Sequence, residues 1–142
     1  MKIYADSSFL VSLYIPDANS ASALRTIQAS SGDRLVIALC ELEVVNAFGL
    51  RVFRKQASRV EANSALVNFE KDLREGLFQL RGLPERLFER ARQLSQQTTA
   101  KLGTRTADLI HVAAALELGA DFLYSFDQQQ RKLAQSVRLK LN

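Results

Sequence analysis

Short apolar segments alternate with longer helical segments along this chain, and that alternation limits the folds it can adopt. Apolar residues fill five short segments, at 2–5, 34–39, 77–80, 122–125 and 137–141. Helical patterns of apolar residues occupy the intervals, at 9–14, 18–29, 41–55, 59–75, 84–100 and 107–118. Strands separated by helices need crossover connections, so the sequence predicts an α/β fold whose mostly parallel sheet has helices on both faces.

Length and composition agree with one domain over 1–142. Hydrophobic residues make up 47% of the chain and charged residues 24%, the balance of a globular protein and not of a disordered tail. The longest apolar run, 35–40, is far shorter than the roughly 20 residues of a membrane helix. No signal peptide is apparent, and the single Cys40 cannot form an internal disulfide. We therefore expect a cytoplasmic protein without a membrane segment.

The charge balance favours a polyanionic partner. Lys and Arg number 19 against 15 Asp and Glu, and 13 of the 19 are Arg, whose planar fork suits phosphate. If four acids shared one pocket, the remaining surface would be strongly basic. A basic surface around an acidic pocket suits a protein that holds nucleic acid and uses a metal ion on it, although ordinary solvated charge is the simpler interpretation.

Acidic residues stand beside the predicted strand ends. Asp6 ends the first strand, Asp127 follows the fourth, Asp108 opens the helix before the fourth, and Glu43 lies early in the helix after the second. In a parallel sheet the working site lies at the carboxyl ends of the strands. We therefore expect these four carboxylates to converge on one rim.

Converging carboxylates repel one another and need a cation. Oxygen ligands without Cys or His favour Mg²⁺ or Mn²⁺, which lower the pKa of a bound water and offset charge on phosphorus oxygens. Other chemistries have little support: His111 is the only histidine and is expected to be buried or to support a ligand, and there is no P-loop, G-x-G-x-x-G or G-x-S-x-G motif.

Each acid also has a purely structural interpretation. Asp6 could cap the helix that follows it, and Asp127 could begin a turn. Asp108 is early in its helix, where negative charge suits the macrodipole. Glu41 and Glu43 are both near a helix start, and only one is expected to be a ligand. Glu43 fits better, because it shares its helix face with the polar Asn46, which could assist a metal ligand.

The sequence resembles the PIN domain family, and most closely its VapC-type toxins. The resemblance is carried by RTADLIHVAAA at 105–115, GAD at 119–121 and YSFD at 124–127. IYADSSFLV at 3–11 is similar to the family's first strand and its acid, and EVVNA at 43–47 to the segment bearing the second acid. The C-terminal motifs are specific, whereas the other two are weak alone.

That resemblance implies a three-layer fold with sheet order 3-2-1-4-5. It also implies that Asp6, Glu43, Asp108 and Asp127 bind one or two Mg²⁺ or Mn²⁺ ions. Ser7 and Ser125 match small hydroxyl positions that support the acids or the attacking water, with Ser125 standing where relatives often have Thr.

The activity implied is metal-dependent endonucleolytic cleavage of RNA by a homodimeric toxin that a VapB-like antitoxin blocks. Three alternatives stay open. They are a PIN nuclease of RNA processing without an antitoxin, a non-catalytic PIN domain that binds RNA or protein, and, less favoured, a phosphohydrolase of small molecules.

Overall fold

A five-stranded, all-parallel sheet organises the computed structural model, which describes residues 1–142. Its strands follow the order β3-β2-β1-β4-β5 and are β1 (Lys2–Ala5), β2 (Asp33–Ile37), β3 (Gln79–Arg81), β4 (Phe122–Tyr124) and β5 (Lys140–Leu141). The predicted fold class and sheet order are both confirmed.

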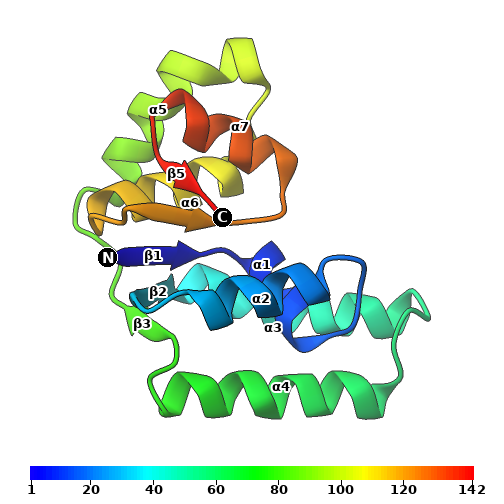
Figure 1. The fold of residues 1–142 in the computed structure, drawn as a ribbon. Helices are drawn as coiled ribbons and strands as arrows, with labels where there is room; N and C mark the ends of the chain where they lie inside the picture. Colours follow the sequence, from blue (N-terminus) through cyan, green and yellow to red (C-terminus); the bar gives the residue numbers. More distant parts are fainter.

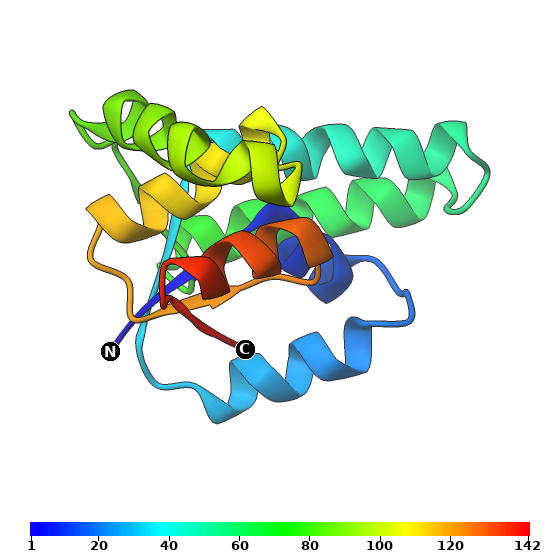
Figure 2. The same cartoon turned by 90° about the horizontal axis from the view of Figure 1, so that it is seen from above.

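Seven helices connect the strands. They are α1 (Ser7–Tyr14), α2 (Ser20–Ala29), α3 (Ala38–Phe53), α4 (Arg59–Arg74), α5 (Leu87–Leu102), α6 (Thr106–Glu117) and α7 (Gln128–Ser136). Helices α1–α4 pack among themselves and so do α5–α7, and Figure 1 shows the second group beside β4 and β5 and the first beside β1 and β2. Figure 2 shows α3 and α4 extending side by side away from both chain ends. None of these helices is both long and apolar enough to cross a membrane.

The central strand explains why the acids meet. Ile3, Tyr4 and Ala5 of β1 are fully buried between β2 and β4, as expected for the middle of a parallel sheet. Ala5 lies opposite Tyr124, and the Asp6 N–H donates to the Tyr124 carbonyl at 3.0 Å. The residues that follow β1 and β4 therefore leave the sheet together.

Two elements differ from the sequence prediction. Helix α7 was not expected, because its sequence QQQRKLAQS offers only Leu133 and Ala134 as apolar residues for the core. The last strand is only Lys140–Leu141, since Val137 ends α7 and Arg138 has φ +62°, which interrupts an extended run. Smaller shifts of two or three residues occur at helix ends; α3 begins at Ala38, so Glu43 lies in its second turn.

Candidate active site

All four predicted carboxylates line one cavity of about 240 Å³ at the carboxyl edge of the sheet. We call it the acid cavity. Its lining comes from four helices, α1, α3, α6 and α7, and from the residues just before three of them, and consists of Asp6, Ser7, Ser8, Glu43, Arg105, Ala107, Asp108, His111, Asp127 and Gln130. Glu41 is not among them, which agrees with the choice of Glu43.

Asp6 is the most enclosed of the four acids, with 1% of its surface exposed. It caps α1 through the Phe9 N–H at 2.9 Å, so the structural interpretation of this residue holds as well. Its other oxygen accepts hydrogen bonds from Ser125 Oγ at 2.6 Å and Gln130 Nε2 at 2.7 Å, and Ser8 Oγ donates to the same carboxylate. Burial raises the pKa of Asp6, and the charge of His111 and the hydrogen bonds from Ser125, Phe9 and Ser8 oppose the rise.

Asp108 and Asp127 share one arginine. Arg105 donates to Asp108 from its backbone N–H, Nε and one terminal nitrogen at 3.0–3.2 Å, and the same terminal nitrogen lies 2.7 Å from Asp127 Oδ2. These hydrogen bonds, that with Asp108 foremost, raise the pKa of Arg105. Gly103, with φ +65°, ends α5 in the left-handed conformation and turns the chain towards this site.

Glu43 is held by a buried imidazole. Its carboxylate forms a hydrogen bond with His111 Nε2, while His111 Nδ1 lies 2.9 Å from the Tyr4 hydroxyl. Burial alone lowers the pKa of His111, but the hydrogen bonds with Cys40 and Glu43 outweigh it and raise that pKa to about 10. His111 is buried, as expected, and it supports a candidate ligand.

The predicted supporting residues have different outcomes. Ser125 contacts Asp6 directly. Ser7 lines the cavity, but the hydroxyl that bonds Asp6 belongs to Ser8. Asn46 lies exposed on α3 outside the cavity and makes no contact with the four acids.

Sequence reasoning missed three residues of the site, and each had a usable signal. Arg105 precedes Asp108 by three positions, the spacing of helix neighbours. Gln130 follows Asp127 by three positions, the pattern of a helix start, and Asp127 indeed caps α7 by accepting from the Gln130 N–H at 3.0 Å. Ser8 stands two residues after Asp6, close enough for its hydroxyl to reach that carboxylate.

The residue types of the acid cavity fit a hard divalent cation. Its ligands would be carboxylate oxygens, with no cysteine and with the single histidine already bonded to Glu43. As the side chains stand, no three acidic, histidine or cysteine residues are placed to hold an ion together. The positive charge beside Asp108 and Asp127 is supplied by Arg105 instead.

A family comparison and a structural comparison both give matches. The model of the PIN domain family matches residues 3–136. Among solved structures, VapC20 of Mycobacterium tuberculosis, a sarcin–ricin loop cleaving toxin, is similar with TM-score 0.68 and 17% identity over 92% of this chain and 93% of that one. FitAcB of Neisseria gonorrhoeae is similar with TM-score 0.68 and 14% identity over 98% and 95% of the two chains.

PAE2754 of Pyrobaculum aerophilum is similar with TM-score 0.61 and 16% identity, covering 94% of this chain and 84% of that chain. A comparison with curated protein sequences gives no significant match. At identities of 14–17%, the similarity to these three structures shows a shared fold.

Proposed function

The chain belongs to the PIN domain family, and from that premise we propose that it is a metal-dependent endoribonuclease, the toxin of a VapBC-type toxin–antitoxin pair. The observation that carries the proposal is the convergence of Asp6, Glu43, Asp108 and Asp127 from four separate elements on one cavity. Arg105 and His111 offset part of the negative charge, and the excess that four carboxylates leave is costly unless the site binds a further cation.

The four acids would hold Mg²⁺ or Mn²⁺. When bound, such an ion would activate a water molecule and offset the charge that develops on phosphorus oxygens. The chain's own residues would prepare the ligands: Ser8, Ser125 and Gln130 fix the orientation of Asp6, and His111 fixes Glu43. Arg105 is 64% exposed at its side chain, so it is free to turn from the acids towards a phosphate.

The toxin role is supported by the structural relatives. VapC20 is a toxin that cleaves the sarcin–ricin loop, and by that likeness we propose RNA as the substrate and a VapB-like protein as the antitoxin. Homodimer formation and a cytoplasmic location remain predictions from the family resemblance.

The test is cleavage of an RNA panel of tRNA, rRNA fragments and unstructured oligomers, with Mn²⁺ or Mg²⁺ against EDTA. We expect metal-dependent cleavage that Asp108→Asn abolishes. The matched control is Asp33→Asn, the same change at an exposed residue that begins β2 at the opposite edge of the sheet.

Metal binding is measured separately, from the rise in melting temperature on adding Mn²⁺. A folded protein that gains stability with Mn²⁺ but cleaves no RNA in the panel would contradict the general nuclease and favour the binding-domain alternative. Cleavage by a protein whose gene has no antitoxin gene beside it would favour RNA processing over the toxin role.

A further inference from the structure

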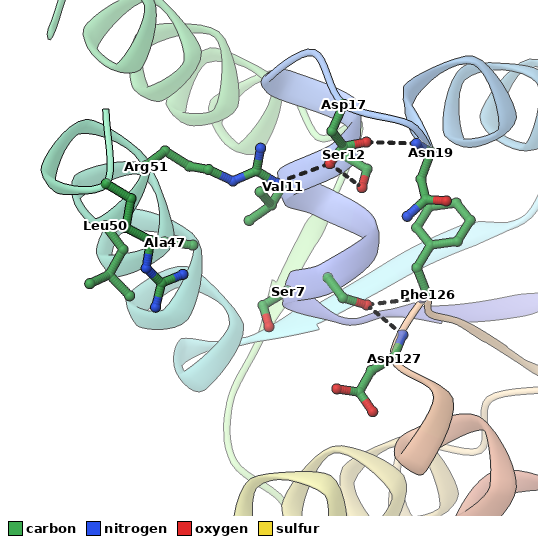
Figure 3. Close-up of a pocket in the computed structure, with 12 residues that line it drawn as sticks. Ser7, Val11, Ser12, Asp17, Asn19, Ala47, Leu50, Arg51, Phe126 and Asp127 are labelled. Carbon is green, nitrogen blue, oxygen red and sulfur yellow. Dashed lines mark hydrogen bonds and ion pairs between the residues drawn. The ribbon is translucent and has the colours of Figure 1, made fainter. Parts of the chain in front are cut away.

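A second cavity, of about 400 Å³, adjoins the acid cavity (Figure 3). The two share Ser7, Ser8 and Asp127, so they form one continuous depression. We call the second cavity the side groove. A molecule lying across the carboxylates would extend into it.

Two walls define the side groove. Ala47, Leu50, Arg51 and Arg54 recur every three or four residues, so they lie on one face of α3. The facing wall comes from α1 and the turn after it, where Figure 3 shows Ser12, Asp17 and Asn19 across from Arg51. The groove is therefore bounded by two helices and lined mainly by polar side chains.

Only one cation of the side groove lacks a partner. Arg51 forms an ion pair with Asp17 at 3.1 Å, and Asp127 is paired with Arg105. Arg54, at the end of α3, is exposed and forms no ion pair or side-chain hydrogen bond. Its guanidinium is thus available to an anion, and its planar fork fits a phosphate.

An aromatic ring lines the side groove, and Figure 3 shows it beside Asn19, with the Asp127 carboxylate pointing the other way. Phe126 is half-buried, and its ring stacks on Phe9 with centroids 5.6 Å apart and planes at 20°. That stacking covers one face of the ring and holds it in place, while Phe126, the residue before Asp127 in the sequence, lines the groove. A fixed aromatic surface is the kind of platform on which proteins stack unpaired bases.

We propose that the side groove is a nucleotide subsite for unpaired RNA. It would take the nucleotide next to the cleaved bond, with the base against Phe126 and a neighbouring phosphate on Arg54. The volume suits a ligand of that size. A base inside a duplex already has neighbours on both faces, so an unpaired base is the better match for the Phe126 ring. This inference rests on the proposed function, and it assigns two RNA contacts of this chain, to Phe126 and to Arg54.

The test is the affinity of a fluorescently labelled single-stranded RNA oligomer, measured by anisotropy in EDTA so that no cleavage occurs. We expect Phe126→Leu to weaken binding about fivefold or more, the lower end for a lost base stack. Arg54→Gln should weaken it about threefold to tenfold and lower the slope of log Kd against log salt by about 0.7. A duplex of the same sequence should bind less tightly than the single strand.

Two control variants separate the subsite from general effects. The first control, Arg74→Gln, makes the same charge change at the last residue of α4, which leads into β3. Arg74 lies about 22 Å along this helix from its first residue, Arg59, and away from the carboxyl edge of the sheet. This variant should change affinity less than Arg54→Gln does. Phe126→Tyr keeps the ring and should bind like the original protein, and melting temperatures check that every variant is folded.

Equal effects of Arg54→Gln and Arg74→Gln, or unchanged binding by Phe126→Leu, would overturn the subsite. So would a duplex that binds as tightly as the single strand. If the original protein still cleaves RNA in those cases, the nuclease proposal stands and only the subsite falls. An original protein that neither binds nor cleaves any RNA would overturn both.

Discussion

The two sides of the acid cavity hold their carboxylates by different means. Asp6 is enclosed by neutral donors, the hydroxyls of Ser8 and Ser125 and the amide of Gln130. Asp108 and Asp127 are bridged by Arg105, a charged and largely exposed side chain. Neutral buried donors fix a geometry without cancelling charge, whereas a surface guanidinium cancels charge but can leave. The Asp6 side is thus preformed, and the Arg105 side is exchangeable.

The largest expected effect tests whether both sides serve one reaction. Asp6→Asn and Asp127→Asn should each lower the rate of RNA cleavage by at least about 100-fold, the scale on which removing one charge-stabilising group from an active site is felt. The measurement is single-turnover cleavage with Mn²⁺. Substantial cleavage by either variant would confine the chemistry to the other side.

Removing a buried hydrogen-bond donor to Asp6 should show how much the preformed side contributes to the stability of the fold. Gln130→Ala takes from Asp6 a hydrogen bond of 2.7 Å at a carboxylate that is almost fully buried. We expect the free energy of unfolding to fall by about 1–3 kcal/mol, the cost of leaving a buried polar group without its partner. Urea denaturation measures the change, and the exposed Gln128→Ala in the same helix is the control.

The Glu43–His111 pair belongs to neither the Asp6 side nor the Arg105 side of the acid cavity. A pH series should reveal what this pair contributes to the stability of the fold. The pKa of His111 is raised to about 10 from its ordinary 6.5. A base whose pKa rises on folding stabilises the folded state fully below pH 6.5, and that contribution is lost as the pH rises towards 10. The free-energy difference between the original protein and His111→Gln should therefore shrink over that window. A difference that stays constant from pH 6 to 10 would mean that the imidazole is neutral in the fold.

The smallest expected effect tests whether Arg105 competes with a metal ion for Asp108 and Asp127. Arg105→Gln should lower the free energy of unfolding by only about 1 kcal/mol, because the exposed guanidinium is lost while the Arg105 backbone N–H still donates to the buried Asp108. The same change should tighten Mn²⁺ binding about threefold to tenfold, because the ion then meets two acids without a competing cation. Calorimetric titration measures the affinity. Arg86→Gln is the control, because Arg86 is also exposed and pairs with an acid three residues later; weaker Mn²⁺ binding by Arg105→Gln would contradict the competition.

The sequence predicted the sheet and the meeting of the acids because both follow from chain order. Once the strands are parallel, residues such as Asp6 and Asp127 must lie at one edge. The supporting residues could not be predicted in this way. Whether Ser7 or Ser8 reaches Asp6 depends on where α1 begins, and a one-residue difference turns the side chain by about 100°.

Helix α7 and Gln130 were missed together, for one reason. A short, mostly polar helix buries too few apolar residues to show a clear periodic pattern, and α7 buries only Leu133 and Ala134 among them. Asn46 lies outside the cavity although it shares a helix face with Glu43, because helix periodicity alone does not decide on which side of that face a cavity opens.

The helix caps formed by Asp6 and Asp127 have a consequence for how this protein can lose its activity over generations. A mutation at either residue to anything other than another capping residue such as Asn or Ser removes a charge from the cavity and also a cap from α1 or α7, so such an inactive descendant would inherit a weakened fold. Glu43 caps no helix and bonds only His111. That pair also stabilises the fold, so selection for folding would preserve the two aspartates through their caps and Glu43 through His111, even in lineages without nuclease activity.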